Sequence, residues 1–249
     1  MLKLARRRGL LVVVSLLTVG AAVATYGIIE LLHLGSPHSH GPAGGVVSLG
    51  HGAWLLSTFG EVAAAIVGSV AGVGDLDAGV YRDLVVTGRS RLALYASRVP
   101  SGLAFLLPLV VAGYAVAAIA GVFLADGQPV PGIGLLSTSG LWVLLEVSFY
   151  FLLALGIACL IGSRSYTIGI VLGFRLALTP ILASVPSLGS VRELVPGVGL
   201  ENLAPSAIAS EIRQGPSIPM SVHTITAVLL VWALAALALG AWRDTRRDA

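Results

Sequence analysis

The chain has 249 residues, of which 56% are hydrophobic and 11% charged, and its mean hydropathy is +0.94. This balance excludes an ordinary soluble domain and indicates a protein whose main solvent is the lipid bilayer. Fourteen of the fifteen basic residues are arginines, clustered between apolar runs, a pattern that favours membrane orientation over nucleic-acid binding. The single cysteine, Cys159, excludes an intramolecular disulfide and a cysteine-based metal site.

Apolar runs long enough to cross a bilayer recur along the whole chain. A hydrocarbon core of roughly 30 Å requires about 20 helical residues. Six runs meet this length and are bounded by Gly, Pro or charge: residues 9–32, 52–73, 101–125, 137–161, 167–185 and 220–242. The predicted fold is therefore all-α, a polytopic membrane domain of six transmembrane helices that covers residues 1–249.

The positions of the basic residues predict how these helices are oriented, because cytoplasmic loops retain Lys and Arg. With the N-terminus inside, twelve of the fifteen fall on the cytoplasmic side: Lys3, Arg6, Arg7, Arg8, Arg82, Arg89, Arg91, Arg98, Arg164, Arg243, Arg246 and Arg247. Both termini are thus predicted to be cytoplasmic. We expect a multi-pass protein of the plasma membrane, and more specifically of a bacterial inner membrane.

Two connections between the spans are long enough to carry structure of their own. In the cytoplasmic loop 74–100, apolar residues alternate with Arg and Asp, which predicts a short amphipathic helix across the cytoplasmic face. A loop that only sets orientation would need the arginines but not the acidic or ordered apolar positions. In the external loop 186–219, residues 200–212 predict a short surface helix on the outer leaflet, with Leu203, Ala207, Ile208 and Ile212 near one face.

Several catalytic and metal-binding patterns are absent from the sequence. The only lysine is Lys3, so the chain has no Walker A loop, and neither His-Glu-x-x-His nor Gly-x-Ser-x-Gly occurs. We therefore expect no ATPase site, no catalytic residue and no cofactor on this chain. External histidines gather at positions 33, 38, 40 and 51, and His38 and His40 could present two imidazoles to a metal, but a solvated polar loop is the preferred interpretation and no metal site is predicted.

Charged residues inside the predicted spans are more informative. A charge near the bilayer centre costs about 2.5 to 3.5 kcal/mol on insertion scales. Glu61, Glu146 and Arg175 each lie about eight or nine residues into their spans, so they fall at a similar depth, and Glu146 can pair with Arg175. Two interpretations remain open: an ion pair that fixes helix packing, or a polar lining for a substrate or proton path.

The segment between the second and third spans carries a family resemblance. An acidic residue and Gly leave the second span, followed by an apolar turn, a Ser-Arg pair, a second apolar turn and a basic residue that enters the third span. These places are filled by Asp77, Gly79, Leu84, Val85, Ser90, Arg91, Leu92 to Leu94, and Arg98. In this pattern and in its six spans, the chain resembles the permease subunits of type-2 ABC transporters. It departs from the family where Gly88 stands in place of a frequent Pro, and Asp-Leu-Asp-Ala-Gly-Val in place of Glu-x-x-Gly-Thr.

The resemblance implies an export permease that works with other chains. The loop would be the coupling helix, which docks on a separate ATP-binding subunit that holds ATP and Mg²⁺. A second permease chain, identical or not, would complete the path through the membrane. The residues implied in the ATPase contact are Asp77, Gly79, Arg82, Asp83, Arg89, Ser90 and Arg91. Glu61, Glu146 and Arg175 would be polar positions in or near the path.

A different class of function is also compatible with the intramembrane charges. Glu61 and Glu146 could act as acid-base groups in a proton-coupled carrier or a membrane-embedded enzyme. The sequence shows no inverted repeat, which weakens the carrier interpretation. Membrane lipids are expected partners in every case, and nucleic acid in none.

Overall fold

The computed structural model describes residues 8–77, 90–212 and 216–246. These residues are mostly helical, with short connections between the helices, and include no strand. Six helices or helix series in this part of the chain are long and apolar enough to cross a membrane. The protein is therefore a multi-pass membrane protein, as the sequence predicts.

The first and fifth spans are interrupted by π-helical turns, and the others are continuous. The first consists of α2 (Arg8–Ser15), the π-helix η1 (Leu16–Gly20) and α3 (Ala21–Gly35). The fifth consists of α8 (Arg164–Leu172), the π-helix η2 (Gly173–Leu178) and α9 (Thr179–Ser184). The remaining four are α4 (Gly45–Asp77), α6 (Arg91–Phe123), α7 (Ile133–Ile161) and α12 (Val222–Arg246).

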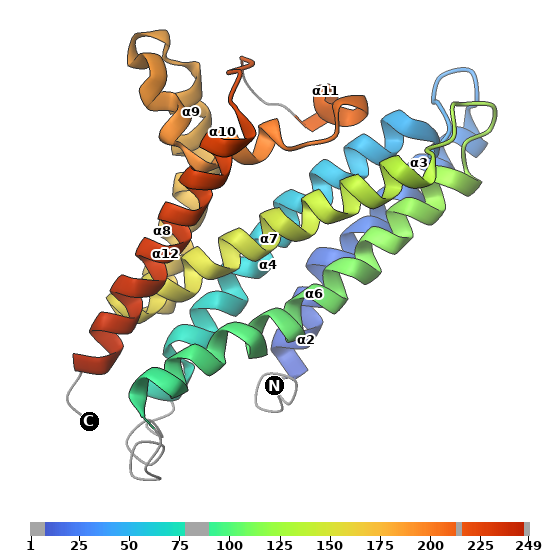
Figure 1. The fold of residues 1–249 in the computed structure, drawn as a ribbon. Coiled ribbons are helices and arrows are strands. Elements are labelled where there is room, and N and C mark those ends of the chain that lie inside the picture. Colours follow the sequence, from blue (N-terminus) through green and yellow to red (C-terminus); the bar gives the residue numbers. More distant parts are fainter. Residues whose placement is uncertain (1–7, 78–89, 213–215, 247–249) are drawn as a thin grey trace.

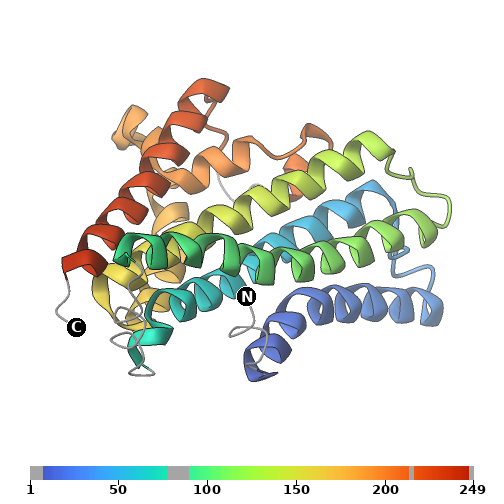
Figure 2. The same ribbon diagram turned by 60° about the horizontal axis from the view of Figure 1, so that its bottom comes forward.

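Successive spans alternate in direction, so the helix ends gather at two ends of the bundle (Figure 1). We call the end where α2 and α6 begin and α12 ends the proximal end. The end where α3 and α6 stop is the distal end. Helix α4 ends and α6 begins at the proximal end, where α2 begins and α12 ends (Figure 1). Helices α2 and α3 lie on the opposite side of the bundle from α8 and α12 (Figure 2).

The centre of the bundle is formed by α4 packed along α7, and glycines let these helices approach closely. A Cβ added at Gly60 would lie 2.6 Å from Val147 Cγ2, and one at Gly68 would lie 2.7 Å from Ala154 Cβ. Real Cβ contacts are longer, so a side chain at either position would push the helices apart. The Gly60 contact also fixes the neighbouring residues Glu61 and Glu146 on facing helices.

Arg98 joins several helices near the proximal end. Its Nη1 lies 3.3 Å from Asp244 Oδ1 on α12, 3.2 Å from the Gly72 carbonyl oxygen on α4 and 3.3 Å from Cys159 Sγ on α7. Tyr95, one turn earlier on α6, donates a hydrogen bond of 2.8 Å to the Leu237 carbonyl on α12. The first two turns of α6 are thus fixed to the three neighbouring helices.

Two helices extend well beyond the predicted spans. Helix α4 begins at Gly45 rather than at residue 52, and α6 begins at Arg91 rather than at residue 101. The Ser90 hydroxyl accepts a 3.2 Å hydrogen bond from the Ala93 N–H and so caps α6. Residues 91–100, predicted to lie in the cytoplasmic loop, therefore form the start of a transmembrane helix. Hydropathy marks the part of a helix that lies in hydrocarbon, whereas capping residues mark where the helix ends.

The prediction of one surface helix over residues 200–212 was wrong. The segment contains the end of α10 (Pro196–Asn202), a 3₁₀ turn η4 (Ser206–Ile208) and α11 (Ala209–Ile212), preceded by the 3₁₀ helix η3 (Pro186–Leu194). Pro205 has no N–H to continue a helix from α10. Leu200, Ile208 and Ile212 are buried in the bundle core instead of facing the outer leaflet.

Candidate functional site

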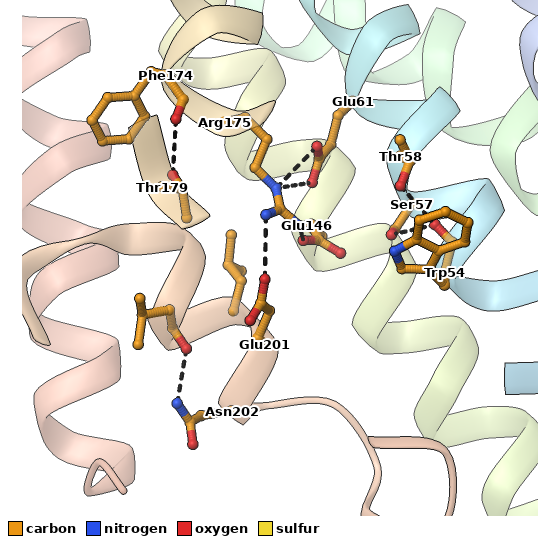
Figure 3. A network of polar contacts seen from close by, with 12 residues as sticks. Trp54, Ser57, Thr58, Glu61, Glu146, Phe174, Arg175, Thr179, Glu201 and Asn202 are labelled. Atoms are coloured by element: carbon orange, nitrogen blue, oxygen red, sulfur yellow. Dashed lines mark hydrogen bonds and ion pairs between the residues drawn. The ribbon is translucent and has the colours of Figure 1, made fainter. Parts of the chain in front are cut away.

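Arg175 lies in the π-helical part of the fifth span, and the local sequence explains why the helix widens there. Pro180 has no N–H to donate to the preceding turn. The Thr179 hydroxyl donates a 3.0 Å hydrogen bond to the carbonyl of Phe174, five residues earlier. Single π-turns within α-helices frequently occur at functional positions. The widened turn directs Arg175, only 6% exposed, toward α4 and α7 (Figure 3).

Arg175 binds both of the intramembrane glutamates that the sequence singles out. Its Nε lies 2.9 Å from Glu61 Oε1 and 3.1 Å from Oε2, and its Nη2 lies 3.3 Å from Glu146 Oε1 (Figure 3). The predicted contact between Glu146 and Arg175 is therefore confirmed, although Glu61 makes the shorter contacts. Glu61 and Glu146 are 1% and 0% exposed, so the three charges are enclosed by the chain itself.

A third carboxylate, which the sequence analysis missed, reaches the same guanidinium. Arg175 Nη1 lies 3.3 Å from Glu201 Oε1 on α10 (Figure 3). The Trp142 indole N–H donates a 2.8 Å hydrogen bond to the Leu200 carbonyl, which holds α10 over α7. The sequence analysis placed Glu201 in the predicted external loop 186–219, which connects the fifth and sixth predicted spans. The signal that could have found it is the apolar run 196–200 just before it, which is buried.

The charges of this cluster, which we call the Arg175 cluster (Glu61, Glu146, Arg175 and Glu201), are not matched one to one. Two fully buried carboxylates share one guanidinium, and Glu201 at the rim makes a further interaction of its own. Glu146 Oε2 and the buried Tyr150 hydroxyl have no hydrogen-bond partner among the described residues. A buried carboxylate oxygen without a donor is costly, so the site can accept a proton or another cation.

The loop residues implied in an ATPase contact are described only in part. Asp77 is the last residue of α4, Ser90 caps α6, and Arg91 is the first residue of α6. Arg91 Nη1 lies 3.4 Å from the Thr245 carbonyl near the end of α12. Gly79, Arg82, Asp83 and Arg89, and with them the predicted amphipathic helix, lie outside the described residues.

The external histidines do not form one group. His33 Nε2 lies 3.2 Å from Asp126 Oδ2, and His51 Nε2 lies 2.8 Å from Glu211 Oε2. Across residues 8–77, 90–212 and 216–246, no three His, Cys, Asp or Glu side chains are placed to hold a metal ion. The structure therefore adds nothing in favour of a metal at His38 and His40.

Comparison with known proteins does not assign the chain. No family model matches the sequence, and no curated protein sequence matches it either.

Proposed function

We propose that this chain is the transmembrane permease subunit of an ATP-driven exporter related to the type-2 ABC transporters. ATP and Mg²⁺ bind to a separate subunit, since this sequence has no Walker A lysine. The proposal rests on the resemblance of residues 77–98. The observation that carries it is that α4 ends and α6 begins at the same end of the bundle where α2 begins and α12 ends (Figure 1).

Helix α6 would transmit a displacement of the loop before it to the neighbouring helices. It is continuous from Arg91 to Phe123, and Tyr95 and Arg98 attach its first turns to α4, α7 and α12. A displacement applied at Ser90 and Arg91 therefore moves several spans together rather than bending α6 alone. Asp77, Gly79, Arg82, Asp83 and Arg89 would complete the ATPase contact.

The Arg175 cluster would be the polar element of the translocation path. Its charges are buried in the described conformation, so a path along them requires α4, α7 and the fifth span to separate. Charged residues at mid-membrane depth are expensive and typically serve function. ATP-driven rocking of the helices would expose the cluster to substrate and close it again.

A second permease chain would complete the path, and α8 offers a surface for it. Added Cβ atoms at Gly169 and Gly173 would meet no atom within 4 Å, and Tyr166 and Ile170 beside them are 71% and 48% exposed. Small residues on an open helix face favour helix association in lipid. The assembly would lie in the plasma membrane, with both termini in the cytoplasm and the basic proximal end on the cytoplasmic side.

Co-purification with an ATP-binding subunit tests the proposal, and we expect the gene for that subunit to lie beside the gene for this chain. Replacing Arg82 and Arg89 by Glu should abolish co-purification and the stimulation of ATP hydrolysis. The matched control is Arg192→Glu in η3, at the distal end, which should leave both unchanged. Normal assembly and normal stimulation in the Arg82/Arg89 variant would contradict the coupling assignment.

A proton-coupled carrier or membrane enzyme remains the second candidate, and one observation favours it. Glu146 Oε2 and the Tyr150 hydroxyl lie buried in the Arg175 cluster region without a hydrogen-bond partner among the described residues. In such a carrier or enzyme, Glu61 and Glu146 would exchange a proton during turnover. The purified chain alone, reconstituted in vesicles with an imposed pH gradient, would then move protons without ATP, whereas the permease proposal expects none.

A further inference from the structure

An open groove of ≈ 540 Å³ runs between α3 and α6, away from the Arg175 cluster. Tyr26, Gly27 and Glu30 line it from α3, and Phe123 lines it at the end of α6. The other lining residues are Val, Leu, Ile and Ala side chains of the same segments. Helix α3 lies at the edge of the bundle and α6 beside it (Figures 1 and 2), so the groove faces the surroundings of the molecule.

One carboxylate interrupts this apolar lining. Glu30 Oε2 is buried and has no hydrogen-bond partner among the described residues. The nearest candidate on the same face is His33, but its two ring nitrogens are already used. Nδ1 lies 2.7 Å from the His40 carbonyl oxygen and Nε2 lies 3.2 Å from Asp126 Oδ2. His33 interacts with Glu30 electrostatically but does not donate a hydrogen bond to it, so the groove holds a carboxylate oxygen without a donor among the described residues.

Two aromatic residues lie in the same groove. The Tyr26 hydroxyl donates a 2.9 Å hydrogen bond to the Ser48 carbonyl, so its polar atom is occupied and its ring remains as lining. Phe123 is 79% exposed, so its ring is open to the groove. Aromatic faces attract cations, and a carboxylate in apolar surroundings attracts them more strongly.

We propose that the α3–α6 groove binds an amphipathic organic cation, with the positive group at Glu30 and the apolar body against Tyr26, Phe123 and the aliphatic lining. A neutral lipid chain would fill the aliphatic part but would leave the Glu30 carboxylate unpaired. A second copy of the chain could pair with the Glu30 carboxylate only if it placed one of its basic residues at the distal end. An amphipathic cation pairs with the Glu30 carboxylate and also fills the apolar part of the groove. This site does not depend on the proposed permease function.

Two ions of nearly equal shape and opposite charge test the proposal directly. We expect saturable binding of tetraphenylphosphonium to the purified full-length chain in zwitterionic nanodiscs, above the background of empty discs, and none of tetraphenylborate. Glu30→Gln should weaken phosphonium binding at least about tenfold. Glu193→Gln in η3, also at the distal end, should leave it unchanged. Equal binding of the two ions, no saturable binding, or unchanged binding to Glu30→Gln would each overturn the proposal.

A second pair of variants tests the location. A Cβ at Gly27 meets no atom within 4 Å, so Gly27→Leu fills the groove without displacing the helices. Gly35 on the same helix also has open space around it but does not line the groove. Gly27→Leu should abolish phosphonium binding and Gly35→Leu should preserve it, with both variants monodisperse. Full binding to Gly27→Leu would place the cation elsewhere and refute the assignment.

Discussion

The two buried arginines of the bundle lie at different depths and have different surroundings. Arg98 is in the second turn of α6, near the proximal end, and contacts the Asp244 carboxylate, a sulfur and a carbonyl. Arg175 is in the middle of the fifth span and contacts three carboxylates. Both guanidinium groups are equally buried, since each residue is 6% exposed. Within the described residues, Arg98 contacts one carboxylate and Arg175 contacts three.

This difference separates two uses of a buried charge. A guanidinium that meets a carboxylate and neutral acceptors fixes helices to one another, as Arg98 does for α4, α6, α7 and α12. A guanidinium shared by two fully buried carboxylates leaves negative charge that packing alone does not require. Buried ion pairs seldom stabilise a fold more than apolar residues of the same size. The Arg98 site therefore has an anchoring geometry, whereas the Arg175 cluster is where we propose the transport path.

Removing Arg175 should have the largest effect on stability. Arg175→Met leaves two buried carboxylates facing each other, and we expect a loss of about 5 kcal/mol in the free energy of unfolding. The triple variant Glu61→Gln, Glu146→Gln and Arg175→Met carries no buried charge at these positions and should recover most of that loss. Unfolding in mixed micelles with increasing SDS measures both.

Transport by the triple variant then tests the assignment. If the cluster belongs to the path, the folded triple variant should have lost transport and the ATPase should be uncoupled from it. If the triple variant is stable and still transports at the normal rate, the cluster only fixes helix packing, and its role is then the same as that of the Arg98 site.

The Arg98 site should show strong coupling between its two charges. We expect Arg98→Met and Asp244→Asn each to cost about 3 kcal/mol. Their double variant should cost less than the sum by about 1 to 3 kcal/mol. A double-mutant cycle of SDS unfolding measures this. Additive costs would mean that Asp244 does not act through Arg98.

The sequence predicted the parts of each site that depend on residues close together in the chain. It missed the parts that depend on contacts between distant segments. The depth of Glu61, Glu146 and Arg175 follows from the rise of a helix, so counting residues predicted their common depth and a contact between Glu146 and Arg175, but not the contact with Glu61. Glu201 could not be found in this way, because a contact from Trp142, far away in the sequence, brings α10 into the bundle. Arg98 was counted as a topogenic charge and as the basic residue that enters the third span, not as a contact between helices. Its role depends on the register of α6 against α12, which hydropathy does not contain.

Neutralising Glu201 should have a moderate effect, because it lies at the rim of the cluster. Its side chain is 14% exposed, whereas those of Glu61 and Glu146 are 1% and 0% exposed. We expect Glu201→Gln to cost about 1 kcal/mol, since the remaining carboxylates still hold Arg175. Glu61→Gln should cost more, and Glu193→Gln in the same external segment should cost nothing measurable. A larger loss for Glu201→Gln than for Glu61→Gln would make the rim, not the buried pair, the centre of the site.

The smallest effect is expected at Cys159, where the Arg98 site can be perturbed without changing any charge. Cys159 is fully buried, and its sulfur lies 3.3 Å from Arg98 Nη1. Cys159→Ala removes this acceptor and should cost about 0.5 kcal/mol, whereas Cys159→Ser keeps an acceptor and should cost less. Transport should be normal in both, because the Asp244 contact remains and still anchors α6. A transport defect in Cys159→Ala without a matching loss of stability would show that the Arg98 site takes part in the cycle, and the two buried arginines would then share one role.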